Sequence, residues 1–132
     1  MGATGGAELR ERTSNLRTLG WAGSVAATAA AVLTAALLGR AWSACDVGVN
    51  NSANGGFLLW VFIPVLTIVL LLTWLGTLAV LHTRPLPCAV VGGALVLAVS
   101  WCALSLFWEG TTYHCPSGVP PWWPDFVPHP GF

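Results

Sequence analysis

Three long stretches of the chain carry no charged side chain. They lie between Arg17 and Arg40, between Asp46 and Arg84, and between Arg84 and Glu109. A helix needs about 20 apolar residues to cross a hydrocarbon core about 30 Å thick, and each stretch contains one such segment. Only a helix satisfies the backbone of such a segment in lipid. The sequence therefore predicts an all-α integral membrane protein with three transmembrane helices, at residues 19–39, 57–81 and 88–108.

The middle stretch is long enough to suggest two spans. Its first part, residues 47–56, reads VGVNNSANGG and is polar and rich in turn-forming Asn and Gly. We therefore place one span after it rather than two within the stretch.

Composition excludes several classes of protein. Charged residues make up 8% of the 132 residues, whereas a soluble domain carries about 25%. So few charges do not cover the surface of a soluble enzyme domain, and they argue against a disordered chain or a nucleic-acid-binding protein. The expected surroundings are a lipid bilayer.

The arginines predict the orientation of the three spans. Lysine is absent, and Arg10, Arg12, Arg17 and Arg84 fall on one side of the membrane, against Arg40 alone on the other. The positive-inside rule places the larger group in the cytoplasm. We thus expect a multi-pass protein of the cell membrane, with a cytoplasmic N-terminal tail (1–18), an outer loop (40–56), a cytoplasmic loop (82–87) and an extracytoplasmic C-terminal tail (109–132).

The first span has a second interpretation. Trp42-Ser43-Ala44-Cys45 after an apolar stretch resembles the cleavage site of a lipoprotein signal peptide. The stretch is longer than a usual signal core, Arg40 interrupts the cleavage region, and Trp42 stands where a branched aliphatic residue is usual. A retained helix is favoured.

Small residues predict where the helices pack closely. The first span repeats a small residue at every fourth position, and the third has two adjacent glycines: Gly23, Ala27, Ala31, Ala35 and Gly39, then Gly92 and Gly93. Such positions let helix backbones approach each other. In the second span, Pro64 removes a backbone N–H and predicts a kink.

The tail combines proline with aromatic residues. It holds six of the nine prolines, which favour an extended chain over a helix. Its aromatic side chains are Trp122, Trp123, Phe126 and Phe132. They need an apolar surface, for which the candidates are the outer leaflet, the loop at 40–56 and a partner protein.

The four cysteines suggest two alternatives for one site. Cys45 and Cys115 follow the first and third spans at similar distances and predict a disulfide in an oxidising compartment. With Asp46 and His114 they also form a possible ligand set for zinc, without any tight two-ligand motif. Cys88 and Cys102 are interpreted as small hydrophobic residues buried in the membrane.

No motif points to catalysis. CxxC, a Walker loop and a Ser/His/Asp set are missing from the sequence, and no span carries an acid, lysine or arginine. We expect no enzyme and no cofactor, but a structural or accessory subunit or modulator of a membrane complex, with a protein partner or as a homo-oligomer. The alternatives are an oligomeric transport or channel component, and a thiol- or metal-binding protein.

The source is also suggested by composition. The absence of lysine beside abundant Ala, Gly and Arg is typical of a GC-rich, bacterial genome. The Asn50-Asn51-Ser52 sequence matches a glycosylation acceptor, which in such a host is only a turn.

Overall fold

The computed structural model describes residues 2–131, which contain helices and no strand. The elements are α1 (Gly2–Cys45), α2 (Asn51–Phe57), the π-helical turn η1 (Leu58–Phe62), α3 (Ile63–Leu81) and α4 (Pro85–Leu106). Because α2, η1 and α3 follow one another without a break, they form one long helix. The described chain thus has three helices that are long and apolar enough to cross a membrane, as the sequence predicts.

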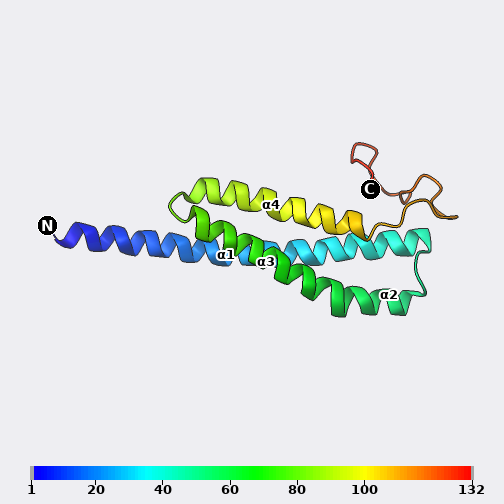
Figure 1. Ribbon diagram of the computed structural model, residues 1–132, viewed down its shortest axis with the longest axis horizontal. Coiled ribbons are helices and arrows are strands. Elements are labelled where there is room, and N and C mark those ends of the chain that lie inside the picture. Colours follow the sequence, from blue (N-terminus) through cyan, green and yellow to red (C-terminus); the bar gives the residue numbers. More distant parts are fainter. Residues whose placement is uncertain (1, 132) are drawn as a thin grey trace.

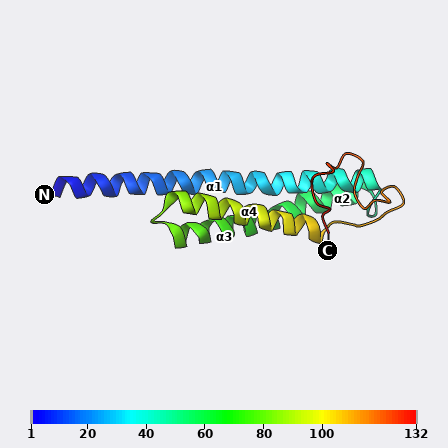
Figure 2. The same cartoon turned by 90° about the horizontal axis from the view of Figure 1, so that it is seen from above.

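The three long helices lie side by side, and α1 extends beyond the other two (Figure 1). With 44 residues, α1 is about 66 Å long at 1.5 Å per residue. We call the end where α3 turns into α4 the hairpin end. The opposite end, where α1 and α4 finish and α2 begins, is the cap end. At the hairpin end the first part of α1 projects past the bundle (Figure 2).

The structure differs from the expected bounds of the N-terminal tail and of the first loop. The segment at 1–18, expected as a tail outside the first span, is helical throughout its described part and belongs to the same helix as that span. The expected loop at 40–56 is shorter, since only residues 46–50 separate α1 from α2. Asn50, which suggested a turn, is the N-cap of α2, and its side-chain oxygen accepts from the Ala53 N–H at 2.8 Å.

The third helix begins earlier than the expected residue 88. It starts at Pro85, where a proline fits because the first residues of a helix need no N–H partner. The helix also ends at Leu106, two residues before the expected Trp108.

Pro64 is accommodated by η1. The five residues before Ile63 form a π-helical turn, and the Ile63 N–H donates to the Leu58 carbonyl, five residues earlier. A π-turn of this kind absorbs the missing N–H and the bulk of the proline ring. The expected irregularity therefore takes the form of a local change of helical pitch, and the helix continues to Leu81.

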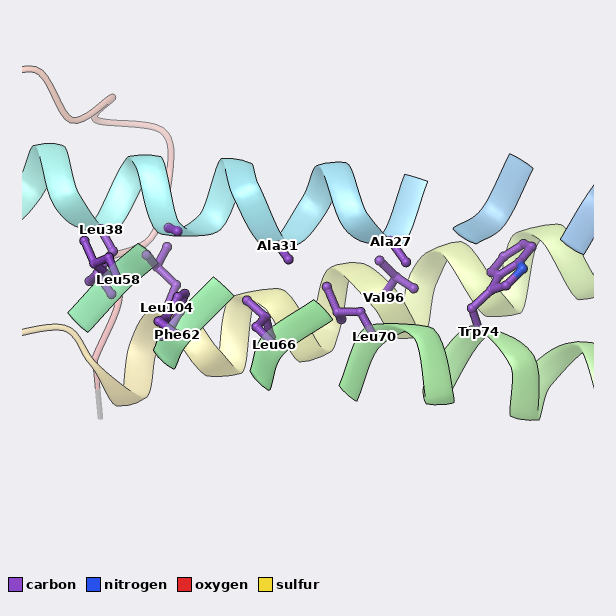
Figure 3. Packing of buried hydrophobic residues seen from close by; sticks show 11 residues of the cluster. Ala27, Ala31, Leu38, Leu58, Phe62, Leu66, Leu70, Trp74, Val96 and Leu104 are labelled. Carbon is purple, nitrogen blue, oxygen red and sulfur yellow. The ribbon is translucent and has the colours of Figure 1, made fainter. Parts of the chain in front are cut away.

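The row of small residues on α1 faces the other two helices. Ala27, Ala31 and Ala35 are buried, and a Cβ placed on Gly39 would lie 3.1 Å from Leu58 Cδ1. Larger side chains from α3 and α4 fill the space left by these small residues (Figure 3). This core contains Leu38, Leu58, Phe62, Leu66, Leu70, Trp74, Val96 and Leu104.

Trp74 occupies the tightest place in the bundle. Its side chain is 6% exposed and extends from α3 toward α1 (Figure 3). A Cβ on Gly23 of α1 or on Gly92 of α4 would overlap the Trp74 indole. Gly93, expected to pack in the same way, has nothing within 4 Å of such a Cβ. Two of the three glycines thus serve one tryptophan, and the third does not.

We predict that a methyl group at Gly23 destabilises the bundle. Gly23→Ala inserts volume against the Trp74 indole, which we expect to lower the free energy of unfolding by about 1–3 kcal/mol. Gly93→Ala is the matched control and leaves it unchanged or higher, because alanine favours a helix over glycine. Unfolding in mixed micelles measures both.

A double variant identifies the cause. Trp74→Leu combined with Gly23→Ala is expected to cost less than the sum of the two single changes, because the clash disappears. Simple additivity of the two changes would contradict the assignment of Trp74 to this position.

Candidate functional site: the tied tail at the cap end

The end of α1 fixes the position of Cys45. Asp46 follows it with a φ of 51°, a left-handed conformation that aspartate tolerates better than most residues. The Val47 N–H then donates to the Trp42 carbonyl at 2.9 Å. This is the hydrogen bond of a Schellman motif, and it stops the helix with Cys45 in its last position.

Cys45 and Cys115 meet at this end. Their sulfur atoms lie 2.03 Å apart, and their Cα atoms 5.3 Å, so the predicted pairing is the one that the structure shows. Thr112 supports the link, since its hydroxyl donates to the Cys45 carbonyl at 3.0 Å. The tail therefore holds the last turn of α1 by a covalent bond and by a hydrogen bond.

Tryptophans hold the rest of the tail. The Trp123 ring lies 5.1 Å from that of Trp108 and 6.5 Å from that of Trp101. The indole N–H groups of Trp108 and Trp123 donate to backbone carbonyls of the tail. Trp108 donates to Gly118 at 2.9 Å, and Trp123 donates to Val127 at 3.2 Å. The tail thereby folds back along α4 rather than extending into solvent, and Figure 2 shows it gathered at the cap end.

Arg40 and Trp122 make a further contact between α1 and the tail. The guanidinium carbon of Arg40 lies 5.2 Å from the centre of the Trp122 ring, within the range of a cation–π interaction. On the other side of α1, the Trp42 indole donates to the Phe107 carbonyl at 3.2 Å. Sequence reasoning missed both contacts, because neither spacing nor residue type connects positions so far apart.

The tail aromatic residues divide into two groups. Trp122 and Trp123 are half-buried and pack on the protein itself, so part of each ring is covered without a partner. Phe126 is 88% exposed and Tyr113 is 96% exposed. Phe132, the remaining expected contact residue, lies outside the described residues. Phe126 and Tyr113 are thus the described aromatic residues of the tail that the protein leaves uncovered.

The arrangement does not offer the four ligands of the zinc alternative. Bonded to each other, Cys45 and Cys115 supply no thiolate. The His114 Nδ1 and Asp46 Oδ2 atoms lie 3.9 Å apart, and both side chains are exposed, so solvent screens any attraction between them. In residues 2–131 no group of three or more His, Cys, Asp or Glu is placed to hold a metal ion.

The other two cysteines differ in their surroundings. Cys88 is buried inside the bundle, whereas Cys102 is exposed on α4. Cys102 therefore faces away from the other helices, where lipid would cover a spanning helix, and only Cys88 packs in the protein interior.

Comparison of the chain with protein families, with curated proteins and with solved structures gave no significant match.

We predict that Trp123 holds the tail and that Phe126 does not. The amides of Gly118 and Val127 donate to the carbonyls of Cys115 and Pro124. Trp123→Ala removes packing worth about 3 kcal/mol, so exchange of these amides is expected to accelerate about 100-fold. Phe126→Ala, the matched control, leaves these amides protected because its side chain packs on little. Equal acceleration in both variants, measured by hydrogen–deuterium exchange, would refute this division.

Proposed function

We propose that the chain is an accessory subunit or modulator of a membrane complex, which it contacts through its tied tail. The observation that carries this proposal is the contrast within the tail. Its tryptophans and its cysteine fasten it to the helices, yet Phe126 remains 88% exposed. A segment that is already ordered loses little conformational entropy on binding, and an exposed aromatic side chain is a frequent anchor of protein interfaces.

The proposed location is the cell membrane, with the N-terminus in the cytoplasm and the tail outside. Two features support this orientation. The count of arginines favours a cytoplasmic hairpin end, since Arg84 lies in the turn between α3 and α4 and Arg10, Arg12 and Arg17 lie in the first part of α1. A disulfide between Cys45 and Cys115 is stable in an oxidising compartment and is rare in the cytosol.

The competing proposal is a transport or channel component that works as an oligomer. The interior of one copy is filled by apolar side chains such as Leu38 and Leu70, so any path for a solute would have to lie between copies. No feature of the described residues favours such a path. A second copy as the tail's partner is nevertheless one outcome of the following experiment.

Site-specific photo-crosslinking tests the docking role. A photoreactive phenylalanine analogue at Phe126 is expected to give a discrete protein adduct in native membranes, because this side chain extends from the fixed tail. The matched control is the same analogue at Val127, a half-buried neighbour whose backbone carbonyl accepts a hydrogen bond from the Trp123 indole N–H. We expect the control to give little or none of the adduct.

The mass of the adduct distinguishes the proposals. A band of the combined mass of this chain and a different protein supports the accessory role, and a band of twice the chain mass supports the oligomer. Equal, diffuse labelling at both positions would mean that lipid or solvent covers Phe126, and would contradict a docking role.

A further inference from the structure

A groove runs between α1 and the start of the second long helix at the cap end. Its volume is 360 Å³, and one face of each helix lines it, at positions i, i+3, i+4 and i+7. The lining residues are Ala36, Gly39, Arg40 and Ser43 of α1, with Asn51, Asn54, Gly55 and Leu58 of α2 and η1. The space beside Gly55 is unfilled, since a Cβ on this residue would meet nothing within 4 Å.

The groove changes from apolar to polar along its length. Ala36 and Leu58 lie at one end, toward the middle of the bundle, and Ser43 and Asn51 lie at the other, toward the cap end. Arg40 stands between them, about 8 Å from the end of α1 at 1.5 Å per residue. Trp60, close to Leu58 in sequence, is exposed and belongs to the residue type that gathers at the lipid–water interface.

Arg40, Ser43 and Asn51 offer the groove's free polar groups, whereas the Asn54 amide donates to the Val47 carbonyl at 2.6 Å. In residues 2–131 no carboxylate lies within ion-pair distance of Arg40. Elsewhere on α1, Ser24, Thr28 and Thr34 donate to the carbonyl four residues earlier. Ser43 makes no such bond within the described residues, so its hydroxyl can donate into the groove. No acid lines the groove.

We propose that this groove binds the phosphate headgroup of an anionic phospholipid from the leaflet at the cap end. The guanidinium of Arg40 would hold the phosphate by paired, charge-assisted hydrogen bonds, with the Ser43 hydroxyl and the Asn51 amide as further donors. The start of an acyl chain would lie along Ala36 and Leu58. The absence of a carboxylate in the groove disfavours a headgroup that is recognised by its ammonium.

Lipid binding would occur whether or not the tail docks a protein. The Arg40–Trp122 contact is made to the face of the ring and does not use up the five N–H donors of a guanidinium. The lipid phosphate and Trp122 can therefore hold Arg40 together.

Native mass spectrometry of the full chain in non-ionic detergent tests this site. The probes are phosphatidylglycerol and phosphatidylcholine with the same acyl chains. We expect phosphatidylglycerol to bind about tenfold more tightly, and Arg40→Gln to remove this preference. Arg84→Gln, which removes a cation at the hairpin end, is the matched control and keeps the preference.

Two glycine variants separate the groove from a general effect of charge. Gly55→Leu fills the groove and is expected to weaken phosphatidylglycerol binding about tenfold. Gly56→Leu adds the same side chain outside the lining residues, where a Cβ likewise meets nothing within 4 Å, and leaves binding unchanged. Trp122→Leu keeps the Arg40 charge and keeps binding, which shows that a loosened tail is not the cause.

Three results would overturn the proposal. Equal binding of the two lipids would do so, as would an unchanged preference in Arg40→Gln. Displacement of phosphatidylglycerol by millimolar inorganic phosphate would show a site for the free anion instead of a lipid.

Discussion

The close approach of α1 to its two neighbours is the interaction on which the rest of the structure depends. Lipid chains are as apolar as leucine, so helices in a membrane associate through packing rather than through escape from water. The buried alanines of α1 permit this packing. Gly23 and Gly92 extend it to all three helices, because both make room for the one Trp74 side chain.

This packing has an electrostatic cost. The Trp74 indole N–H is buried without a hydrogen-bond partner among residues 2–131, and an unsatisfied buried donor costs about 1–3 kcal/mol. The shape of the indole between two glycines offsets this cost through its contacts. Trp74 therefore serves the bundle by its volume and not by its polar atom.

The position of α1 also determines what happens at the cap end. Because α1 runs beside α4 along the bundle, Trp42 in its last turn meets Phe107 at the end of α4, and α1 continues past α4 to the level of the tail (Figure 1). The sulfur–sulfur link, the Thr112 hydrogen bond and the Arg40–Trp122 contact all join the tail to α1. The tail is consequently an extension of the helical packing, with Phe126 directed away from it.

The sequence predicts the number of spans and the cysteine pair well, and the local detail less well. Charges are so unfavourable in lipid that their positions delimit the helices, and two cysteines beyond helices that end on one side have few other partners. Helix ends depend on weaker effects. The Schellman bond from Val47 and the N-cap at Asn50 shorten the loop, although the polar segment at 47–56 suggests a longer one.

The partners of the aromatic residues could not be read from the sequence for a different reason. Trp123 packs on Trp101 and Trp108, and Trp122 on Arg40, and these contacts depend on the three-dimensional path of a proline-rich tail. Gly92 and Gly93 are indistinguishable in composition, yet only the first faces Trp74. The sequence pattern predicts that the segment is a helix, but which face of the helix is buried depends on how the neighbouring helices pack against it.

A bond between Cys45 and Cys115 joins α1 to the tail, and we propose that it lies on the outer face of the membrane. Labelling of intact cells with a membrane-impermeant maleimide tests it most directly, in a Cys88→Ser/Cys102→Ser background that retains only the paired cysteines. We predict no labelling before reduction and labelling of both cysteines after a membrane-impermeant reductant. Labelling without reductant would contradict the bond, and labelling that requires permeabilised cells would contradict the orientation.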